Sequence, residues 1–160
     1  MTAGFDPHDH AACRRAALAH AETVCREAGV RLTDTRRRVL EILLEDHRAL
    51  GAYAILDRLR DEGLGAQPPV AYRALDFLVR HGLAHRIEHL NAFVACAHPG
   101  RGHAPIFLIC RSCAAVAEAP AAPVMAALGS AAQDAGFAVD HAMVEADGLC
   151  PACQGAGQGA

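Results

Sequence analysis

The sequence has no apolar run that approaches the roughly 20 residues needed to cross a membrane. The first ten residues also lack the cationic and then apolar stretch of a secretory signal. We therefore expect a cytoplasmic protein, in which the seven cysteines are metal ligands or buried thiols rather than a disulfide framework. At 160 residues, 52% of them hydrophobic, the chain can hold one or two small domains with buried cores.

Lysine is also absent, so every cationic side chain is an arginine. Arginine suits phosphate and guanine, although genome composition explains an arginine-only set equally well. The net charge of −3 is poor for a nucleic-acid-binding protein, but the charge is unevenly distributed. Residues 1–90 carry 13 Arg against 13 acidic residues, and residues 91–160 carry two against five. The excess negative charge therefore belongs to the C-terminal part.

Two C-x-x-C pairs organise the C-terminal half, Cys110 with Cys113 and Cys150 with Cys153. Two residues between the thiols let both sulfurs face one ion, and two such pairs supply the four ligands of a closed tetrahedral site. Zinc suits thiolate ligands and adds no redox chemistry. The alternatives are independent redox pairs or packing cysteines, but no thioredoxin-like unit precedes the first pair. The spacing predicts a structural zinc site.

The N-terminal half has the element order of a winged helix-turn-helix. Apolar spacing predicts helices at 11–28, 34–44, 52–62 and 70–81, followed by strands at 83–88 and 92–95. In that geometry the helix from Val70 lies in the major groove and its first residues contact bases. Arg73 is the natural guanine reader there, and Tyr72 can contact a phosphate or a thymine methyl. A small helical domain with an ordinary polar face is the alternative.

The second predicted helix begins with three consecutive cations, from Arg36 to Arg38. Cations at a helix N-terminus oppose the helix dipole, so they invite an external anion such as phosphate. A solvated basic face accounts for this segment equally well.

Four further candidate ligands surround the boundary between the halves: His85, Cys96, His103 and Glu118. Two imidazoles, one thiolate and one carboxylate would leave a bound Zn²⁺ formally neutral, which a partly buried site tolerates best. An ion held by this set would fix the angle between the halves, as a metal sensor requires. Taken singly, each of these side chains could be solvated or simply packed. His89 and His98 remain alternative ligands at similar distance.

These segments together resemble the ferric-uptake-regulator family, and within it the branch of zinc-uptake regulators. The resemblance covers about residues 11–153. Besides the first thiol pair, the segments that carry it are Arg31-Leu-Thr-x-x-Arg36, Pro68-Pro-x-x-Tyr72-Arg-Ala-Leu-Asp-Phe77-Leu, His81-Gly-Leu-Ala-His85-Arg-Ile-Glu88, Asn91-Ala-Phe-Val-Ala-Cys96 and Gly148-Leu-Cys-x-x-Cys153.

The resemblance implies an α+β fold and a homodimer that binds double-stranded operator DNA. It implies two Zn²⁺ per subunit, one structural ion on the four paired cysteines and one sensory ion on His85, Cys96, His103 and Glu118. Arg31 and Arg36 join Tyr72 and Arg73 as the expected DNA-contacting residues. The expected parts are a tail at 1–10, a winged-helix domain at 11–88, a dimerisation and metal-binding α/β domain at 89–153 and a flexible tail at 154–160.

The C-terminal domain is expected to contain strands at 106–110, 114–118 and 137–145, with a helix at 120–135 between the last two strands. Two departures from the family stand out. Val70-Ala71 replaces the usual Thr-Val, which removes a hydroxyl near the DNA. Ala114 replaces the glycine that usually follows the first thiol pair, so the turn is strained if this position needs a positive φ.

The resulting hypothesis is a zinc-dependent transcriptional repressor that controls zinc-uptake and homeostasis genes. A regulator of the same fold that senses iron, manganese or nickel is one alternative, and a thiol-redox sensor or chaperone that uses the four-cysteine site is another. We expect no catalytic activity, because both predicted metal sites use all four coordination positions.

Overall fold

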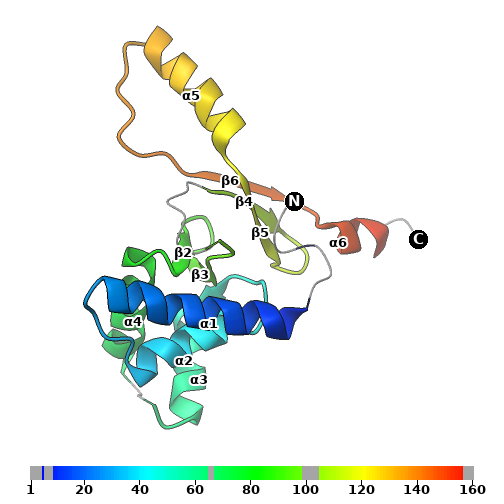
Figure 1. Cartoon of the computed structure of the whole chain (residues 1–160). Coiled ribbons are helices and arrows are strands. Elements are labelled where there is room, and N and C mark those ends of the chain that lie inside the picture. The colour runs from blue at the N-terminus through cyan, green and yellow to red at the C-terminus, as the bar shows by residue number, and fades with distance from the viewer. Residues whose placement is uncertain (1–4, 6–8, 65–66, 99–104, 157–160) are drawn as a thin grey trace. The chain divides into compact units, whose positions relative to one another are not determined.

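A computed structural model describes Phe5 and residues 9–64, 67–98 and 105–156. Its contacts divide the chain into two compact units, which are described one at a time: an N-terminal unit of residues 6–101, and a C-terminal unit of residues 102–160 with residues 1–5 (Figure 1). Among the expected site residues, His103 lies outside the described residues. No helix in the described ranges is both long enough and apolar enough to span a bilayer.

Four helices build the N-terminal unit: α1 (His10–Glu27), α2 (Asp34–Leu43), α3 (Ala52–Asp61) and α4 (Pro68–Arg80). Their starts follow from local chemistry. The Asp9 carboxylate accepts the Ala12 N–H at 3.0 Å, and the Thr33 hydroxyl accepts the Arg36 N–H at 3.4 Å. Pro68 begins α4, where its missing N–H would have no helical partner. The four helices predicted from the sequence are therefore confirmed.

The helices bury their apolar faces against one another and against a small sheet. Strands β1 (Leu50–Gly51), β2 (Ala84–Ile87) and β3 (Ala92–Ala95) pair antiparallel in the order β1-β3-β2. The largest fully buried side chains of the shared core come from α2, α3 and α4, and they are Leu40, Ile42, Leu43, Ile55, Leu59, Leu75 and Leu78. This packing fixes the outer face of α4, because its inner face is held by the core.

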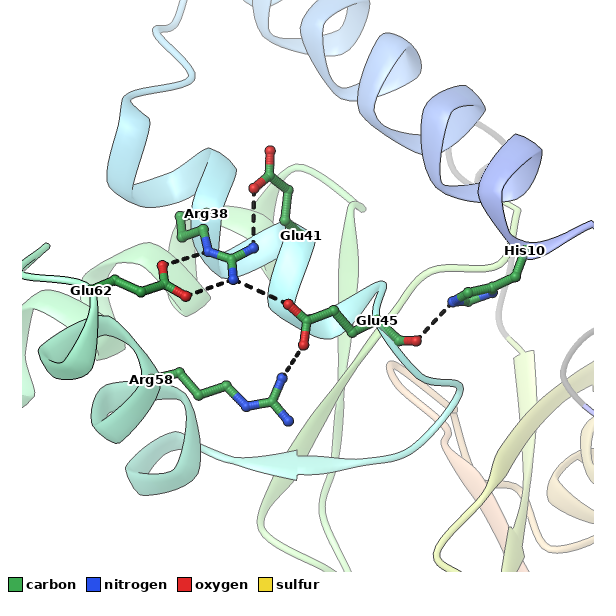
Figure 2. A network of polar contacts seen from close by, with 6 residues as sticks. All are labelled: His10, Arg38, Glu41, Glu45, Arg58 and Glu62. Atoms are coloured by element: carbon green, nitrogen blue, oxygen red, sulfur yellow. Dashed lines mark hydrogen bonds and ion pairs between the residues drawn. The ribbon is translucent and has the colours of Figure 1, made fainter.

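Ion pairs add a second connection between α2 and α3 (Figure 2). The Arg38 guanidinium contacts Glu62 at 2.6 Å, Glu45 at 3.1 Å and Glu41 at 3.2 Å, and Glu45 also pairs with Arg58. The hydrogen bond from Arg38 lowers the pKa of the Glu62 carboxyl. Several charges that share one guanidinium hold helices more firmly than isolated surface pairs do.

The C-terminal unit contains β4 (Pro105–Cys110), β5 (Val116–Pro120), α5 (Ala122–Asp134), β6 (Val144–Gly148) and α6 (Pro151–Ala156). Its sheet has the order β5-β4-β6, with β4 antiparallel to β5 and parallel to β6. The parallel pair requires a crossover connection, and the segment containing α5 supplies it (Figure 1). The sheet register places Cys110 opposite Gly148.

The structure corrects the predicted strand at 137–145, because the strand begins only at Val144 and continues to Gly148. Phe137 and Met143 are 67% and 41% exposed. The alternating pattern there therefore reflects apolar side chains that are exposed in the single chain, and not a buried face of a strand. The end of the chain differs as well. The short helix α6 includes 154–156, which the sequence suggested to be part of a flexible tail.

The two wing strands pair along their whole length, and they form one hairpin of the N-terminal unit. Its turn places Asn91 at a φ of 46°, a conformation that asparagine tolerates. The compact N-terminal unit therefore extends beyond residue 88, where the sequence suggested that the first domain ends, to residue 101.

Candidate metal centres and nucleic-acid interface

The four paired cysteines converge at one edge of the C-terminal sheet. Cys110 ends β4, and Cys113 follows in a turn whose Ala114 N–H donates to the Cys110 carbonyl at 2.9 Å. Cys150 follows β6, and Cys153 lies in α6. Because β4 and β6 run parallel and end opposite each other, both C-x-x-C segments leave the same edge.

The four Sγ atoms lie within 4.8 Å of one another, and those of Cys113 and Cys150 are 3.8 Å apart. Backbone N–H groups of Cys150 and Cys113 point at the Cys110 thiol and lower its pKa to about 6, because they stabilise the thiolate. This cradle of donors holds one sulfur in the form that binds metal.

Cys153 has the opposite shift. The Ser112 hydroxyl favours its thiolate, but the neighbouring thiols of Cys150, Cys113 and Cys110 together outweigh this and raise the pKa of Cys153 to about 12. Four sulfurs so close together cannot all ionise unless a cation compensates their charge. A thiophilic divalent ion that accepts four thiolates therefore fits this cluster, and zinc is the ion that such a set suits best.

Two of the predicted sensory ligands come together in the N-terminal unit. His85 lies in β2, and Cys96 follows β3, where its N–H donates to the Leu83 carbonyl at 3.1 Å. His85 pairs with Val94, so Cys96 is its diagonal neighbour on the same face of the hairpin. The donor atoms of His85 and Cys96 lie within 4.8 Å of each other, and Cys96 is buried.

Glu118 lies in the other unit, on β5 opposite Phe107 of β4. It is 4% exposed and is the one charged side chain among the described residues that is classed as buried. A buried carboxylate requires a compensating charge or hydrogen-bond donors. The two alternative ligands, His89 and His98, are exposed, and neither belongs to a group of three or more converging donors in the described ranges.

The predicted DNA-contacting residues lie on one helix and at the start of another. Tyr72 and Arg73 are exposed near the beginning of α4, and Tyr72 is 42% exposed. Arg36, in the first turn of α2, stacks its guanidinium 3.7 Å above the Phe77 ring of α4 and donates to the Arg31 carbonyl at 2.7 Å. These contacts connect the start of α2 to α4.

The structure also presents an aromatic residue that the sequence analysis did not single out. Tyr53, in the first turn of α3, is 67% exposed. The chain has two tyrosines, and both are exposed on the N-terminal unit. An alternating or helical pattern cannot reveal such a residue, because periodicity identifies the side chains that are buried and not the use of the exposed ones.

Comparisons with known proteins agree with this arrangement. A family model described as the ferric uptake regulator family matches residues 27–146. The zinc uptake regulation protein of Escherichia coli (strain K12) is 41% identical over 137 residues, which cover 85% of this chain and 80% of that protein. The protein of the same description from Shigella flexneri matches to the same extent.

Two solved structures are similar over nearly the whole chain. A zinc uptake regulator complexed with zinc and DNA has a TM-score of 0.85 at 38% identity, and the match covers 91% of this chain and 97% of that one. The crystal structure of holo XcZur has a TM-score of 0.76 at 37% identity, with coverages of 86% and 96%.

Proposed function

The chain belongs to the ferric uptake regulator family, and from this premise we propose that it is a zinc-responsive DNA-binding repressor of zinc-uptake and homeostasis genes. The observation that carries the proposal is a four-thiol cluster in a chain 41% identical to a zinc uptake regulation protein. The protein acts in the cytoplasm as a homodimer on double-stranded operator DNA. It is not an enzyme, because neither proposed metal site leaves a coordination position for a substrate.

The structural ion is held by Cys110, Cys113, Cys150 and Cys153. Their convergence supports this assignment, as do the N–H groups that stabilise the Cys110 thiolate. These residues connect the end of β4 to α6 and so close the C-terminal unit around α5 and β6. When bound, zinc supplies four directional bonds and no redox chemistry.

The regulatory ion is held by His85, Cys96, His103 and Glu118. The neighbouring donors of His85 and Cys96 support this set, and so does the burial of the Glu118 carboxylate. The thiolate and the carboxylate offset the two positive charges of Zn²⁺, and the imidazoles complete a neutral set. The thiolate favours zinc over iron or manganese, which prefer oxygen and nitrogen ligands.

The four regulatory residues come from both units, so their simultaneous engagement restricts how the units are held. In the metal-loaded dimer the two α4 helices would sit roughly 34 Å apart, the spacing of successive major grooves. Arg73 then contacts a base and Tyr72 contacts a phosphate or a thymine methyl, while Arg31 and Arg36 contact the phosphate backbone. A preference of about 5 kcal/mol for the DNA-binding arrangement is enough to switch the population almost completely.

Replacement of one regulatory ligand tests this function. We expect Cys96→Ser to remove zinc-dependent operator binding, measured by fluorescence anisotropy with and without a chelator. The structural zinc and the dimer should persist in metal analysis and light scattering, because Cys96 is not in the four-cysteine cluster. Cys25→Ala, which removes another buried thiol, is the control and should keep the zinc response. A Cys96→Ser protein that still responds fully to zinc would contradict the assignment.

A further inference from the structure

A cavity of about 290 Å³ lies within the N-terminal unit, and it shares only Cys96 with the proposed zinc sites. Three segments line it: one face of α1, the residues that follow α2, and the end of β3 with the residues after it. The lining residues are Cys13, Ala16, Ala17, His20, Leu44, His47, Ala95, Cys96 and Ala97. A thiol and two imidazoles therefore line the cavity in addition to Cys96, the proposed regulatory ligand.

The cavity exists because α1 combines donors with very small side chains. Cys13 and His20 lie seven positions apart and so share one face of the helix, with Ala16 and Ala17 between them. The alanine methyl groups are too short to fill the space across to Leu44. The two donors are thus separated by open volume rather than by packed side chains.

The polar groups around this volume are not those of a simple packing defect. The Nε2 atom of His20 is buried and has no hydrogen-bond partner among the described residues. A buried polar atom without a partner costs free energy, so a site of this kind calls for an unseen partner or a function. Cavities that stay empty in proteins are lined by apolar groups, whereas this one has a buried imidazole nitrogen on its wall.

On the opposite wall, His47 is held by further contacts. The ring of His10 packs edge-on against the His47 ring, with centroids 5.1 Å apart. The Nε2–H of His10 in turn donates to the Glu45 carbonyl at 2.8 Å (Figure 2). The packed His10 ring therefore limits the rotation of the His47 imidazole.

We propose that Cys13, His20 and His47 form a third metal site, exchangeable and specific for a thiophilic divalent cation such as Zn²⁺. One thiolate and two imidazoles suit zinc, whereas Mg²⁺ and Ca²⁺ require oxygen ligands that this lining does not offer from its side chains. The three protein ligands leave a fourth position for water. Because the three donor atoms are not all within 4.8 Å of one another, the ion must draw the side chains inward, which lowers its affinity.

The test uses the full-length dimer with its structural zinc in place. Glu118→Ala is introduced first, because this residue belongs to the proposed regulatory set but not to the cavity lining. Co²⁺ is then titrated as a spectroscopic substitute for Zn²⁺, and the zinc retained on the four cysteines is measured in parallel. We expect one Co²⁺ per subunit, with the intense visible bands of tetrahedral cobalt and a thiolate-to-cobalt charge-transfer band.

Three variants in this background identify the ligands. Cys13→Ser should abolish the charge-transfer band, and His20→Ala and His47→Ala should each weaken Co²⁺ binding by about tenfold or more. His89→Ala, an exposed histidine of the wing, is the control and should bind as before. Ala16→Leu fills the cavity from its exposed rim without removing a donor, so it should block binding in a protein that keeps the α1 helix.

The proposed site would be overturned if the Glu118→Ala protein bound no Co²⁺ beyond the zinc retained on the four cysteines. It would equally be overturned if Co²⁺ binds but Cys13→Ser, His20→Ala and Ala16→Leu leave the spectrum unchanged. These outcomes are independent of the proposed regulatory function, because that function is tested by the zinc response of the Cys96→Ser protein.

Discussion

Ala114 occupies the turn that follows the first thiol pair and has a φ of 59°, in the left-handed region. An L-residue with a Cβ is disfavoured there because the methyl group crowds the backbone. Its N–H still donates to the Cys110 carbonyl, so the turn is formed despite the strain. The strain that the sequence suggested at this position, on the condition of a positive φ, is therefore present. The four-cysteine cluster keeps a conformation that glycine would adopt more easily.

We therefore expect Ala114→Gly to stabilise the zinc-loaded protein by about 1 kcal/mol. Glycine removes the steric cost of a Cβ at positive φ, and the greater conformational entropy that glycine loses on folding offsets only part of this gain. Urea unfolding monitored by circular dichroism measures the change. Ala115→Gly is the matched control, and it should lower stability because Ala115 forms an extended bridge where glycine offers no advantage. If both substitutions lowered the free energy of unfolding, the positive φ of residue 114 would not be a source of strain.

Residue-level chemistry was the easiest part to infer from the sequence. Two matched C-x-x-C pairs predict a metal site by spacing alone, and the structure brings their four thiols together. The cavity beside α1 was not foreseeable in this way. Cys13 and His20 share a helical face, but His47 is brought near them only by the packing of α2 against α1. Long-range proximity of this kind leaves no periodic signal in the sequence.

At the scale of single elements, α4 is the helix that the rest of its unit positions. Five of its apolar side chains are buried in the core, namely Ala71, Ala74, Leu75, Phe77 and Leu78. Arg36 stacks on the Phe77 ring. Tyr72 and Arg73 are left exposed near its beginning, within the part of a recognition helix that enters the major groove. The beginning of α4 therefore presents Tyr72 and Arg73 to a DNA groove.

We expect Arg73→Ala to lose about 1–3 kcal/mol of discrimination at one base pair of each half-site, because one arginine–guanine contact is removed. Binding to a panel of single-base operator variants measures this loss. Arg80→Ala, on the same helix but about two turns further on, is the matched control and should leave the base preference intact. An unchanged preference profile in Arg73→Ala would exclude Arg73 as a base reader.

The helices and the wing were predictable because caps and apolar periodicity define them locally. Thr33 and Pro68 mark helix starts, and the two wing strands flank a turn. The prediction for 137–145 is wrong up to residue 143, because its period-two alternation does not reflect strand pairing there and Phe137 and its neighbours are mostly exposed. A pattern that reflects contact with another chain cannot be distinguished from one that reflects a sheet within the same chain.

At the scale of the whole molecule, the C-terminal unit leaves several large apolar side chains exposed to solvent in a single chain. Val124 and Leu128 lie one turn apart on α5, and Leu128 is 37% exposed. Phe137, Val139 and Met143 add to the exposed apolar surface of the same unit. Several exposed large apolar side chains in one unit are what a subunit interface would cover, and a second copy of the chain is the partner that a homodimer provides.

We therefore expect Leu128→Asp to shift the protein toward monomer, because a carboxylate cannot be buried in an apolar interface without a large desolvation penalty. Light scattering after gel filtration measures the mass. The affinity for operator DNA should fall as the dimer dissociates, because a monomer cannot bind both half-sites of the operator at once. Gln133→Asp places the same charge on an exposed polar position of α5 and should leave the dimer intact. A dimeric Leu128→Asp protein would place the interface elsewhere.

The parallel pairing of β4 with β6 determines when the four-cysteine cluster can form during synthesis of the chain. The thiols of Cys113 and Cys150 meet across 37 positions of chain, so a ribosome must synthesise the whole α5 crossover before the cluster can close. A nascent polypeptide interrupted anywhere in that span carries only two of the four cluster cysteines, Cys110 and Cys113. A chain truncated in that span therefore cannot form the four-thiolate site that joins the end of β4 to α6.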